Sequence, residues 1–472
     1  MPRSPFARTK VVCTLGPASC SPEVLRSLME AGLNVARINF SHGTYDEHAQ
    51  TIATVRRLAR ELDRPVAILG DLQGPRIRVG DLAAPVELVP GADIVLVPED
   101  EARSGEIPVT YHALAEDVSV GDRVLMDDGL IDLVVLDVSK PRVRVRVVHG
   151  GLLRSHKGIN LPGVDVSAPS ITEKDRADIA FAIEQGLDYL ALSFVRRADD
   201  IATLRTLVPK DLLVVAKIEK DTALANIENI IEASDAVMVA RGDLGVELPF
   251  EEVPFAQKRI IALANALGRP VITATQMLES MVSNPRPTRA EASDVANAIL
   301  DGTDAVMLSA ETAMGEYPQL AVHAMTRIIL EIESRPIPQQ AKVLARRESD
   351  AAVSTEDAIA AATTAAANSL DAPLVMVFTK SGFSARIVSA HRPGVPIFAI
   401  TDVERTYRQL ALVWGVHPEL VSKAATYEEM FERGSRAVKD TGFAKAGDRI
   451  LVTAGVPFDV PGTTNLLRVE HV

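Results

Sequence analysis

The stretch LLVVAKIE, residues 212–219, is apolar for five residues and then becomes polar at Lys217 and Glu219. It lacks the strict alternation of apolar and polar residues that marks a strand with one solvated face. A run of this kind is typical of a parallel strand that is covered on both faces. Residues two apart in an extended chain point the same way. We therefore predict a buried parallel strand that presents both charged side chains together at its carboxyl end.

The same pattern recurs along the chain, where amphipathic helical stretches separate seven further apolar runs. These runs are TKVVCTLG (9–16), LNVARINF (33–40), PVAILGDL (65–72), DYLALSFV (188–195), DAVMVARG (235–242), PVITATQM (270–277) and DAVMLSAE (304–311). One intervening stretch, SPEVLRSLMEAG, has Ser21 at the N-cap position, Pro22 in the first turn and Gly32 after the end. Eight strand–helix units over roughly 240 residues predict a (β/α)₈ TIM barrel. An open doubly wound sheet is the alternative, and the absence of a GxGxxG motif counts against it.

One interval between consecutive runs is much longer than the others. Most of it, residues 73–165, is Val-rich and alternating, as in RVRVRVV (142–148), and it contains turns such as DDGL. We predict an all-β domain inserted after the third barrel strand. The alternating arginines are compatible with an RNA-binding strand or with the solvated face of an antiparallel sheet. The negative net charge of the chain favours the solvated face.

The character of the sequence changes again after residue 340. ARRESDAAVSTED (345–357) has the composition of a linker, and EDAIAAATTAAANSL (356–370) predicts a strong helix. The strands predicted after it are APLVMVFT, VPIFAIT and DRILVTAG. We therefore expect an α/β sequence divided into a first barrel part (1–72), an inserted β domain (73–165), a second barrel part (166–340) and a C-terminal α/β domain (341–472).

The composition narrows the classes of function. The 472 residues include 50 Lys and Arg against 63 Asp and Glu, a net charge of −13, which argues against a nucleic-acid partner. No window reaches the ~18 uninterrupted apolar residues of a membrane span, and MPRSPFARTK lacks the apolar segment of a signal peptide. The two cysteines, Cys13 and Cys20, are too few for a disulfide scaffold. We expect a cytoplasmic protein without a disulfide and with no membrane partner.

Polar side chains follow the predicted barrel strands at the mouth where TIM barrels carry their function. They are Arg37, Asn39, Asp71, Ser193, Lys217, Glu219, Arg241, Asp243, Thr275, Ser309 and Glu311. Two carboxylates, Glu219 and Asp243, without Cys or His in their motifs suit a hard cation such as Mg²⁺. Arginines and a lysine suit a phosphate or carboxylate. The combination indicates phosphoryl transfer or enolate stabilisation, and no Walker loop or HExxH motif offers another chemistry.

Seven motifs together resemble the pyruvate kinase family, almost end to end and in the family's order. They are TKVVCTLGPAS, GLNVARINFSHG, SHKGINLPG, AKIE, MVARGDLGVE, ATQMLESM and DGTDAVMLSAETAMGEYP. The resemblance implies a barrel with a mobile β lid inserted after its third strand and a C-terminal regulatory domain. The implied reaction converts phosphoenolpyruvate and ADP to pyruvate and ATP, the last step of glycolysis.

The resemblance also implies roles for residues at the mouth. Glu219 and Asp243 match the ligands of Mg²⁺, for which Mn²⁺ can substitute. Lys217 matches the lysine between the transferred phosphoryl group and the enolate, where its charge would be worth several kcal/mol. Arg37 matches the phosphate-binding arginine.

Further matches concern the substrate carboxylate and the nucleotide. Gly242 and Thr275 match positions near the substrate carboxylate, and Thr275 also ends the path that protonates the enolate. The positions that match nucleotide or phosphate contacts are Asn39, Ser41, His42, Arg78 and Lys157. Arg78 and Lys157 lie at the two hinges of the lid, so its closure would bring cations onto ADP.

Many members of the family need K⁺, held at positions that match Asn39, Ser41, Asp71 and Leu72. Those members have threonine, lysine, glutamate and threonine where this chain has Leu72, Gln73, Arg76 and Val79. Leu72 offers no side-chain oxygen, whereas Arg76 adds a permanent positive charge. A guanidinium about 4 Å from Asp71 would contribute roughly 4 kcal/mol at an effective dielectric of 20, before desolvation. We therefore expect Arg76 to replace K⁺ beside Asn39, Ser41 and Asp71, in an enzyme that needs Mg²⁺ but not K⁺.

The segment TKSGFSA, residues 379–385, matches the loop that binds an effector phosphate in the family. Its hydroxyls and backbone N–H groups at Thr379, Ser381, Gly382 and Ser384 suit a phosphate, although the same residues also make helix N-cap turns. The segment GVPFDVPGTTN resembles the family's closing loop but has no arginine cluster. From the resemblance we expect an allosterically regulated homotetramer.

Two other functions compete with this prediction. A Mg²⁺-dependent barrel lyase acting on phosphoenolpyruvate or pyruvate would share the carboxylate pair but would not need a lid with nucleotide contacts. A catalytically inactive regulatory paralogue would normally have lost one of Lys217, Glu219, Asp243 or Thr275, and this chain keeps all of them.

Overall fold

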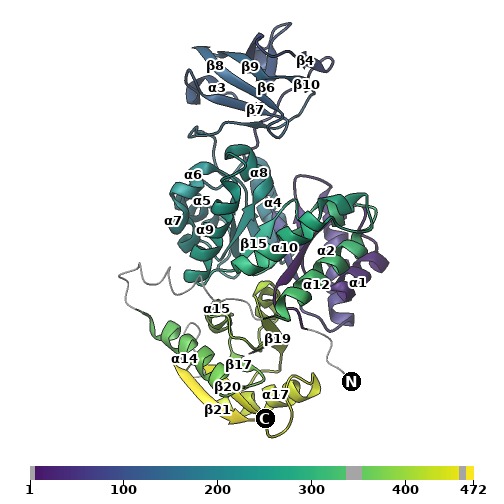
Figure 1. Cartoon of the computed structure of the whole chain (residues 1–472), viewed down its shortest axis with the longest axis vertical. Coiled ribbons are helices and arrows are strands. Elements are labelled where there is room, and N and C mark those ends of the chain that lie inside the picture. The colour runs from purple at the N-terminus through teal and green to yellow at the C-terminus, as the bar shows by residue number, and fades with distance from the viewer. Residues whose placement is uncertain (1–5, 336–352, 456–463) are drawn as a thin grey trace.

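The computed structural model describes residues 6–335, 353–455 and 464–472 (Figure 1). Eight parallel strands form a closed barrel in the order β1-β16-β15-β14-β13-β12-β3-β2. The strands are β1 (Lys10–Leu15), β2 (Leu33–Asn39), β3 (Ala67–Asp71), β12 (Tyr189–Leu192), β13 (Leu213–Ile218), β14 (Ala236–Ala240), β15 (Val271–Ala274) and β16 (Ala305–Leu308). The predicted TIM barrel is therefore confirmed, and the open doubly wound sheet is excluded.

The local sequence explains why these elements form. All six residues of β13 are buried, as the run of apolar residues predicts. The hydroxyl of Ser21 accepts a hydrogen bond from Val24 N at the start of the first helix, and Gly32 ends that helix at φ 128°. The helices in the barrel part of the chain are α1 (Pro22–Ala31), α2 (Tyr45–Glu61), α4 (Glu173–Glu184), α5 (Ala198–Arg205), α6 (Asp221–Ala225), α7 (Ile227–Ala233), α8 (Arg241–Glu247), α9 (Val253–Ala266), α10 (Arg289–Asp301), α11 (Ala310–Ala313) and α12 (Pro318–Glu333).

The chain leaves the barrel after β3 and returns before α4, and the intervening segment is mainly β structure. It stands beyond the barrel at the top of Figure 1, and we call it the lid. Its main sheet has the order β11-β7-β8-β9-β5-β6, and β10 pairs with β4. The elements are β4 (Val86–Leu88), β5 (Asp93–Pro98), β6 (Ile107–Val109), α3 (Leu114–Asp117), β7 (Arg123–Met126), β8 (Ile131–Ser139), β9 (Arg142–His149), β10 (Gly151–Leu153) and β11 (Ile159–Asn160).

The arginines of β9 lie on the outer face of the lid sheet, while Val143, Val145 and Val147 are buried. Arg146 Nε donates to Asp93 Oδ1 at 2.8 Å, and Arg142 Nε donates to Glu106 Oε1 at 2.7 Å. Arg144 also lies 3.4 Å from Asp93. Neighbouring carboxylates thus pair with these cations, as expected for the solvated face of an antiparallel sheet.

The C-terminal part is an α/β unit whose sheet has the order β19-β18-β17-β20-β21. Its strands are β17 (Val375–Phe378), β18 (Ile397–Thr401), β19 (Val416–Leu420), β20 (Arg449–Ala454) and β21 (Leu466–His471). Its helices are α14 (Thr355–Ser369), α15 (Phe383–Ala390), α16 (Glu404–Gln409), the 3₁₀ turn η3 (Leu410–Leu412) and α17 (Tyr427–Asp440). The linker expected before it lies largely outside the described residues, as does most of the loop GVPFDVPGTTN.

The 3₁₀ turn η3 closes the barrel at the mouth opposite the carboxyl ends of the strands. Ala411 and Leu412 belong to the same buried cluster as the inward-facing barrel residues Val12 and Val35. Next to this turn, the hydroxyl of Tyr189 donates to the Gln409 carbonyl at 2.6 Å. The C-terminal unit therefore contributes apolar side chains to the barrel interior.

Two further predictions concern the chain as a whole. Cys13 and Cys20 are both free thiols, so no bridge joins them. Within the described ranges, no helix is both long enough and apolar enough to cross a membrane.

Candidate active site

Asp71 ends β3 at the carboxyl mouth of the barrel and is almost fully buried between two cations. Arg37, on the neighbouring strand β2, donates from Nε to Asp71 Oδ2 at 2.7 Å, and Lys217 Nζ lies 3.2 Å from Asp71 Oδ1. Burial alone would raise the pKa of Asp71, but the charges of Lys217 and Arg37 outweigh burial and hold that pKa below its usual value. The carboxylate is therefore ionised and orients both cations.

Lys217 lies at the centre of this site. Its ammonium donates to Ser193 Oγ at 2.7 Å and pairs with Glu219 Oε1 at 2.8 Å, in addition to Asp71. Burial would lower the pKa of Lys217, but the two carboxylates outweigh that effect and raise it. Lys217 is thus a permanent, buried cation whose position is fixed by three oxygen atoms.

Ser193 had no role in the sequence-based prediction beyond its place at a strand end. Its hydroxyl accepts from Lys217 and lies 2.7 Å from the Leu72 carbonyl, to which it donates. It therefore ties the ammonium to the end of β3. The sequence showed only that a polar residue follows β12, and it did not reveal that Ser193 would contact Lys217 and the Leu72 carbonyl.

The two carboxylates predicted to hold a metal lie at the ends of adjacent strands. Glu219 follows β13 and is buried, while Asp243 lies in the first turn of α8 after β14 and keeps 30% of its side chain exposed. Burial raises the pKa of Glu219, the charge of Asp243 adds to that increase, and Lys217 opposes it. The backbone N–H of Phe194 also donates to Glu219 Oε2 at 2.7 Å.

This donor set fits Mg²⁺. Over the described parts of the chain, no group of three or more His, Cys, Asp and Glu side chains could hold an ion. Mg²⁺ commonly binds through one or two protein carboxylates and completes its shell with water and substrate oxygens. Glu219 and Asp243 supply hard oxygen atoms of that kind, and their mutual repulsion, visible in the raised pKa of Glu219, would be relieved by a divalent cation.

Gly242 and Thr275 meet across two strand ends. The backbone N–H of Gly242 donates to Thr275 Oγ1 at 2.7 Å, and the hydroxyl donates to the Ala274 carbonyl at 2.7 Å. Thr275 has φ 67° and Gln276 has φ 54°, so two consecutive non-glycine residues adopt the left-handed conformation. This conformation is unfavourable for a β-branched residue and requires support from its surroundings.

Arg241 provides that support. Its Nη2 donates to the Thr275 carbonyl at 2.7 Å and to the Gln276 carbonyl at 3.3 Å, and its Nη1 pairs with Asp294 at 2.7 Å. One planar guanidinium therefore holds the backbone turn that carries the Thr275 hydroxyl. The sequence analysis located Arg241 at a strand end but predicted no role for it.

The predicted nucleotide-binding residues lie on both sides of the hinge between barrel and lid. Asn39 ends β2 beside Asp71 and accepts from Ser41 N at 3.1 Å, and His42 is exposed on the same loop. In the lid, Arg78 Nη1 donates to the His156 carbonyl at 3.0 Å, and Lys157 pairs with Asp127 at 2.7 Å.

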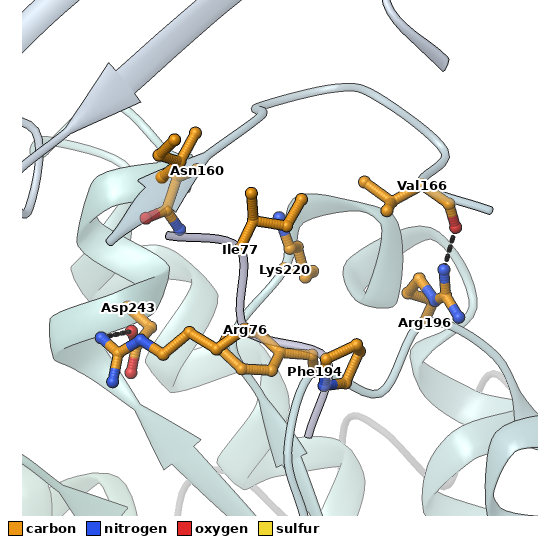
Figure 2. Close-up of a pocket in the computed structure, with 10 residues that line it drawn as sticks. Arg76, Ile77, Asn160, Val166, Phe194, Arg196, Lys220 and Asp243 are labelled. Carbon is orange, nitrogen blue, oxygen red and sulfur yellow. Dashed lines mark hydrogen bonds and ion pairs between the residues drawn. The ribbon is translucent and has the colours of Figure 1, made fainter. Parts of the chain in front are cut away.

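The partner expected for Arg76 was wrong. Its guanidinium lies 3.7 Å from Asp243 Oδ1, while Arg37 and Lys217 occupy both oxygens of Asp71. Figure 2 shows Arg76 reaching from the segment after β3 to Asp243, along a small cavity that Lys220 and Asn160 also line. The backbone bends away from Asp71 after Gly74, at φ 68°, and this bend carries Arg76 toward α8.

The predicted effector loop joins β17 to α15. Gly382 has φ 77° at the start of α15, and no side chain caps that helix through a hydrogen bond. Thr379 and Ser384 are buried, Ser381 is exposed, and Ser384 Oγ lies 2.6 Å from Thr464 Oγ1. The four residues thus form one turn in which Ser384 already has a hydroxyl partner.

Comparisons with known proteins agree with this geometry. The family model "Pyruvate kinase, barrel domain" matches residues 6–322, and "Pyruvate kinase, alpha/beta domain" matches residues 357–470. Curated proteins named pyruvate kinase from Geobacillus stearothermophilus, Bacillus licheniformis and Staphylococcus aureus (strain MRSA252) are 48%, 47% and 45% identical to this chain. Each match covers 98% of this chain and 80% of the relative. With both family domains matched and relatives this similar, the chain belongs to the pyruvate kinase family.

Proposed function

We propose that the protein transfers the phosphoryl group of phosphoenolpyruvate to ADP and so forms pyruvate and ATP. The observation that carries this proposal is the position of Lys217, whose ammonium lies 3.2 Å from Asp71 and 2.8 Å from Glu219. A fixed cation between an arginine–aspartate pair and a metal-binding carboxylate suits a reaction in which negative charge moves between a phosphoryl group and an enolate.

Each residue at the carboxyl mouth of the barrel would have its own role in this reaction. Arg37 would bind the phosphoryl group, and Lys217 would neutralise charge on that group and on the enolate oxygen. Glu219 and Asp243 would hold Mg²⁺, which supplies Lewis-acid stabilisation of the same charges. The N–H of Gly242 and the hydroxyl of Thr275 would orient the substrate carboxylate, and Thr275 would end the path that delivers a proton to the enolate.

The nucleotide would bind between barrel and lid. Asn39, Ser41 and His42 lie on the barrel side, and Arg78 and Lys157 lie at the hinges of the lid. Because Lys157 is paired with Asp127, the diphosphate of ADP would have to displace the Asp127 carboxylate from the lysine ammonium. Closure over ADP would then exclude water from the transfer.

The decisive assay is pyruvate formation from phosphoenolpyruvate, coupled to lactate dehydrogenase, with ADP present in one arm and omitted in the other. The kinase requires that pyruvate formation vanish without ADP. A lyase would release its product in both arms, and an inactive paralogue would be silent in both. Removal of Mg²⁺ by chelation should abolish turnover, and Mn²⁺ should restore it.

We also propose that turnover does not require K⁺. Leu72 lacks the side-chain oxygen of K⁺-dependent members, and its carbonyl already accepts from Ser193. Arg76 supplies a permanent cation within 3.7 Å of Asp243, in place of the glutamate of those members. The surrogate charge therefore acts at Asp243, on α8, rather than at Asp71.

The test is turnover at constant ionic strength in tetramethylammonium chloride and in KCl. More than tenfold activation by K⁺ would refute the proposal. The double variant Arg76→Glu with Leu72→Thr should gain K⁺ dependence, while Arg103→Glu, at an exposed site of the lid, serves as a charge-matched control.

Finally, we propose a cytoplasmic, allosterically regulated homotetramer. The free thiols of Cys13 and Cys20 support a reducing compartment. The turn at Thr379, Ser381, Gly382 and Ser384 would receive the phosphate of a phosphorylated effector. Ser384→Asp places a fixed negative charge there and should abolish activation by phosphorylated metabolites. Ser389 is not a suitable control position, because it is buried and its hydroxyl donates to the Trp414 carbonyl. Activation equal to wild type would place the site elsewhere.

A further inference from the structure

Among the contacts between the lid and the barrel, several converge on one short helix, α8. Asp243, Val246 and Glu247 of α8 are spaced i, i+3 and i+4, so their side chains share one face of that helix. We call these three residues the α8 face. Three separate parts of the lid segment reach it, and each meets a different one of the three residues.

The segment that follows β3 reaches the α8 face through charge, since Arg76 lies 3.7 Å from Asp243. The turn between β7 and β8 lies close to it, because a β-carbon placed on Gly129 would lie 3.6 Å from Val246 Cγ1. Strand β11 reaches it by a hydrogen bond from Asn160 Nδ2 to Glu247 Oε1 at 2.9 Å. Figure 2 shows Asn160 above Lys220, and Arg76 reaching to Asp243.

The hydrogen bond at Asn160 is the most informative of the three contacts. The Glu247 side chain is fully buried, and Lys220 Nζ donates to the same oxygen at 2.7 Å. Its other oxygen, Oε2, is buried and has no hydrogen-bond partner among the residues that the structure describes. A buried carboxylate that depends on only two donors loses a large part of its stabilisation when either is removed.

These contacts connect the lid directly to the residues proposed to bind Mg²⁺ and substrate. Asn160 belongs to β11, which pairs with β7 in the main sheet of the lid. Glu247 ends the helix whose first turn carries Gly242 and Asp243, and Lys220 directly follows Glu219. A shift of the lid sheet can therefore act on both proposed metal-binding carboxylates through the buried junction of Asn160, Glu247 and Lys220, in addition to the direct contact of Arg76 with Asp243.

We infer that Glu247 is a positioning residue that couples the orientation of the lid to the geometry of the metal-binding helix. The coupling is reciprocal, because a lid orientation that favours one position of α8 is itself favoured by that position. Weakening the Asn160–Glu247 contact should therefore loosen the lid and also weaken Mg²⁺ binding, although Asn160 and Glu247 touch neither metal nor substrate in this proposal.

Lid orientation can be measured without the reaction, by electron–electron double resonance between spin labels at Val120→Cys in the lid and Arg259→Cys on α9. Cys20→Ser removes the exposed native thiol. Asn160→Ala should broaden the distance distribution, and Asn160→Asp should broaden it more, because it opposes a second carboxylate to Glu247. Ser139→Ala, on the surface of the lid, should leave the distribution unchanged.

The rescue experiment separates this specific contact from general damage. In the double variant Asn160→Asp with Glu247→Gln, the amide and the carboxylate exchange places, so the hydrogen bond between the two positions is restored in the opposite direction. The carboxylate at position 160 then replaces Glu247 as the partner of Lys220, which shares the acceptor Glu247 Oε1 with Asn160 in the wild type. The distribution should return to that of wild type, and the Mg²⁺ midpoint, raised at least fivefold in Asn160→Asp, should return with it. The inference is overturned if Asn160→Asp leaves the distribution unchanged, or if the double variant is no better than the single one.

The Mg²⁺ arm rests on the proposed function, whereas the distance arm does not. If turnover proves independent of ADP while Asn160→Asp still broadens the distribution and the swap restores it, the proposed reaction fails and the lid coupling stands. If turnover depends on ADP but the distribution never changes, the coupling fails and the reaction stands.

Discussion

Lys217 concentrates several functions in one side chain. It neutralises Asp71 and Glu219, both nearly fully buried, and its own charge is maintained by them. Asp71 has a second cation in Arg37, whereas Glu219 is paired with Lys217 at 2.8 Å. Removing the ammonium should therefore affect catalysis through the substrate and stability through Glu219.

Lys217→Met should reduce kcat by about 10²–10³, because one preorganised cation is lost from the site of charge transfer. It should also lower the free energy of unfolding by about 3–5 kcal/mol, since a buried carboxylate loses its partner. Coupled turnover and urea unfolding measure the two effects, with the exposed Lys210→Met as the control. Retained turnover within tenfold of wild type would remove Lys217 from the mechanism.

His417 predicts a different response, to acid. Its ring stacks on Phe398 at 5.1 Å and lies among Phe6 and Phe443. Burial, reinforced by the charge of Lys10, lowers the pKa of His417 to about 4. The unfolded chain therefore binds this proton more readily between pH 6.5 and 4, and stability is lost as the pH falls through that window.

His417→Phe should remove this loss, because phenylalanine keeps the stacking and does not titrate. The difference between a pKa of about 4 and the ordinary histidine pKa of 6.5 corresponds to about 3 kcal/mol at full effect. The fall in Tm between pH 7 and pH 4.5 should be smaller in His417→Phe than in wild type, while the exposed His112→Phe should behave as wild type does. Equal falls in all three proteins would contradict the assignment.

Among the elements, the turn after β15 depends most on a distant side chain. Arg241 donates to the carbonyls of Thr275 and Gln276, which both have positive φ. The Thr275 hydroxyl accepts from Gly242 N, so a relaxed turn would misplace both groups. The fork of the guanidinium is needed here, because a lysine ammonium cannot span the same carbonyls and Asp294.

Arg241→Lys should therefore lower kcat about tenfold to a hundredfold by misplacing the Thr275 hydroxyl, although the charge is kept. Arg259→Lys, on the exposed side of α9, is the matched control. Steady-state kinetics with varied phosphoenolpyruvate measure the effect, and circular dichroism checks the fold. An unchanged kcat in Arg241→Lys would show that the turn keeps its conformation without the guanidinium.

The elements also show what the sequence could and could not reveal. The barrel strands were predictable because apolar runs such as LLVVAKIE record burial on both faces, and Ser21 and Gly32 mark helix ends through local chemistry. The left-handed Thr275 was not predictable, since its own residue type disfavours that conformation. The partner of Arg76 was mistaken for a different reason. The prediction relied on strand spacing, but the chain turns at Gly74 before it reaches Arg76.

On the scale of the whole molecule, two large apolar side chains are exposed near the start of α9. Phe250, before the helix, is 85% exposed, and Phe255, in its first turn, is 74% exposed. Large apolar side chains that gather on a surface mark interaction sites more often than isolated ones do. They offer a candidate for part of the interface in the proposed homotetramer.

Phe250→Ser together with Phe255→Ser should shift the protein toward smaller species in sedimentation velocity, because each change removes apolar area from that interface. Val120→Ser, in which a 67% exposed residue of the lid is replaced, should leave the sedimentation coefficient unchanged. If the double variant sediments as wild type does, these phenylalanines lie outside the interface.

The 3₁₀ turn η3 closes the barrel at the mouth opposite the carboxyl ends of the strands, and it is synthesised only after the barrel strands are complete. Ala411 and Leu412 pack with Val12 and Val35, yet they leave the ribosome after the last barrel strand, β16, which ends at Leu308. At ~5–20 residues per second, the intervening hundred or so residues take about 5–20 s. For that time the nascent barrel can join its first and last strands but has an uncovered apolar end, which is a binding site for chaperones until the C-terminal unit folds against it.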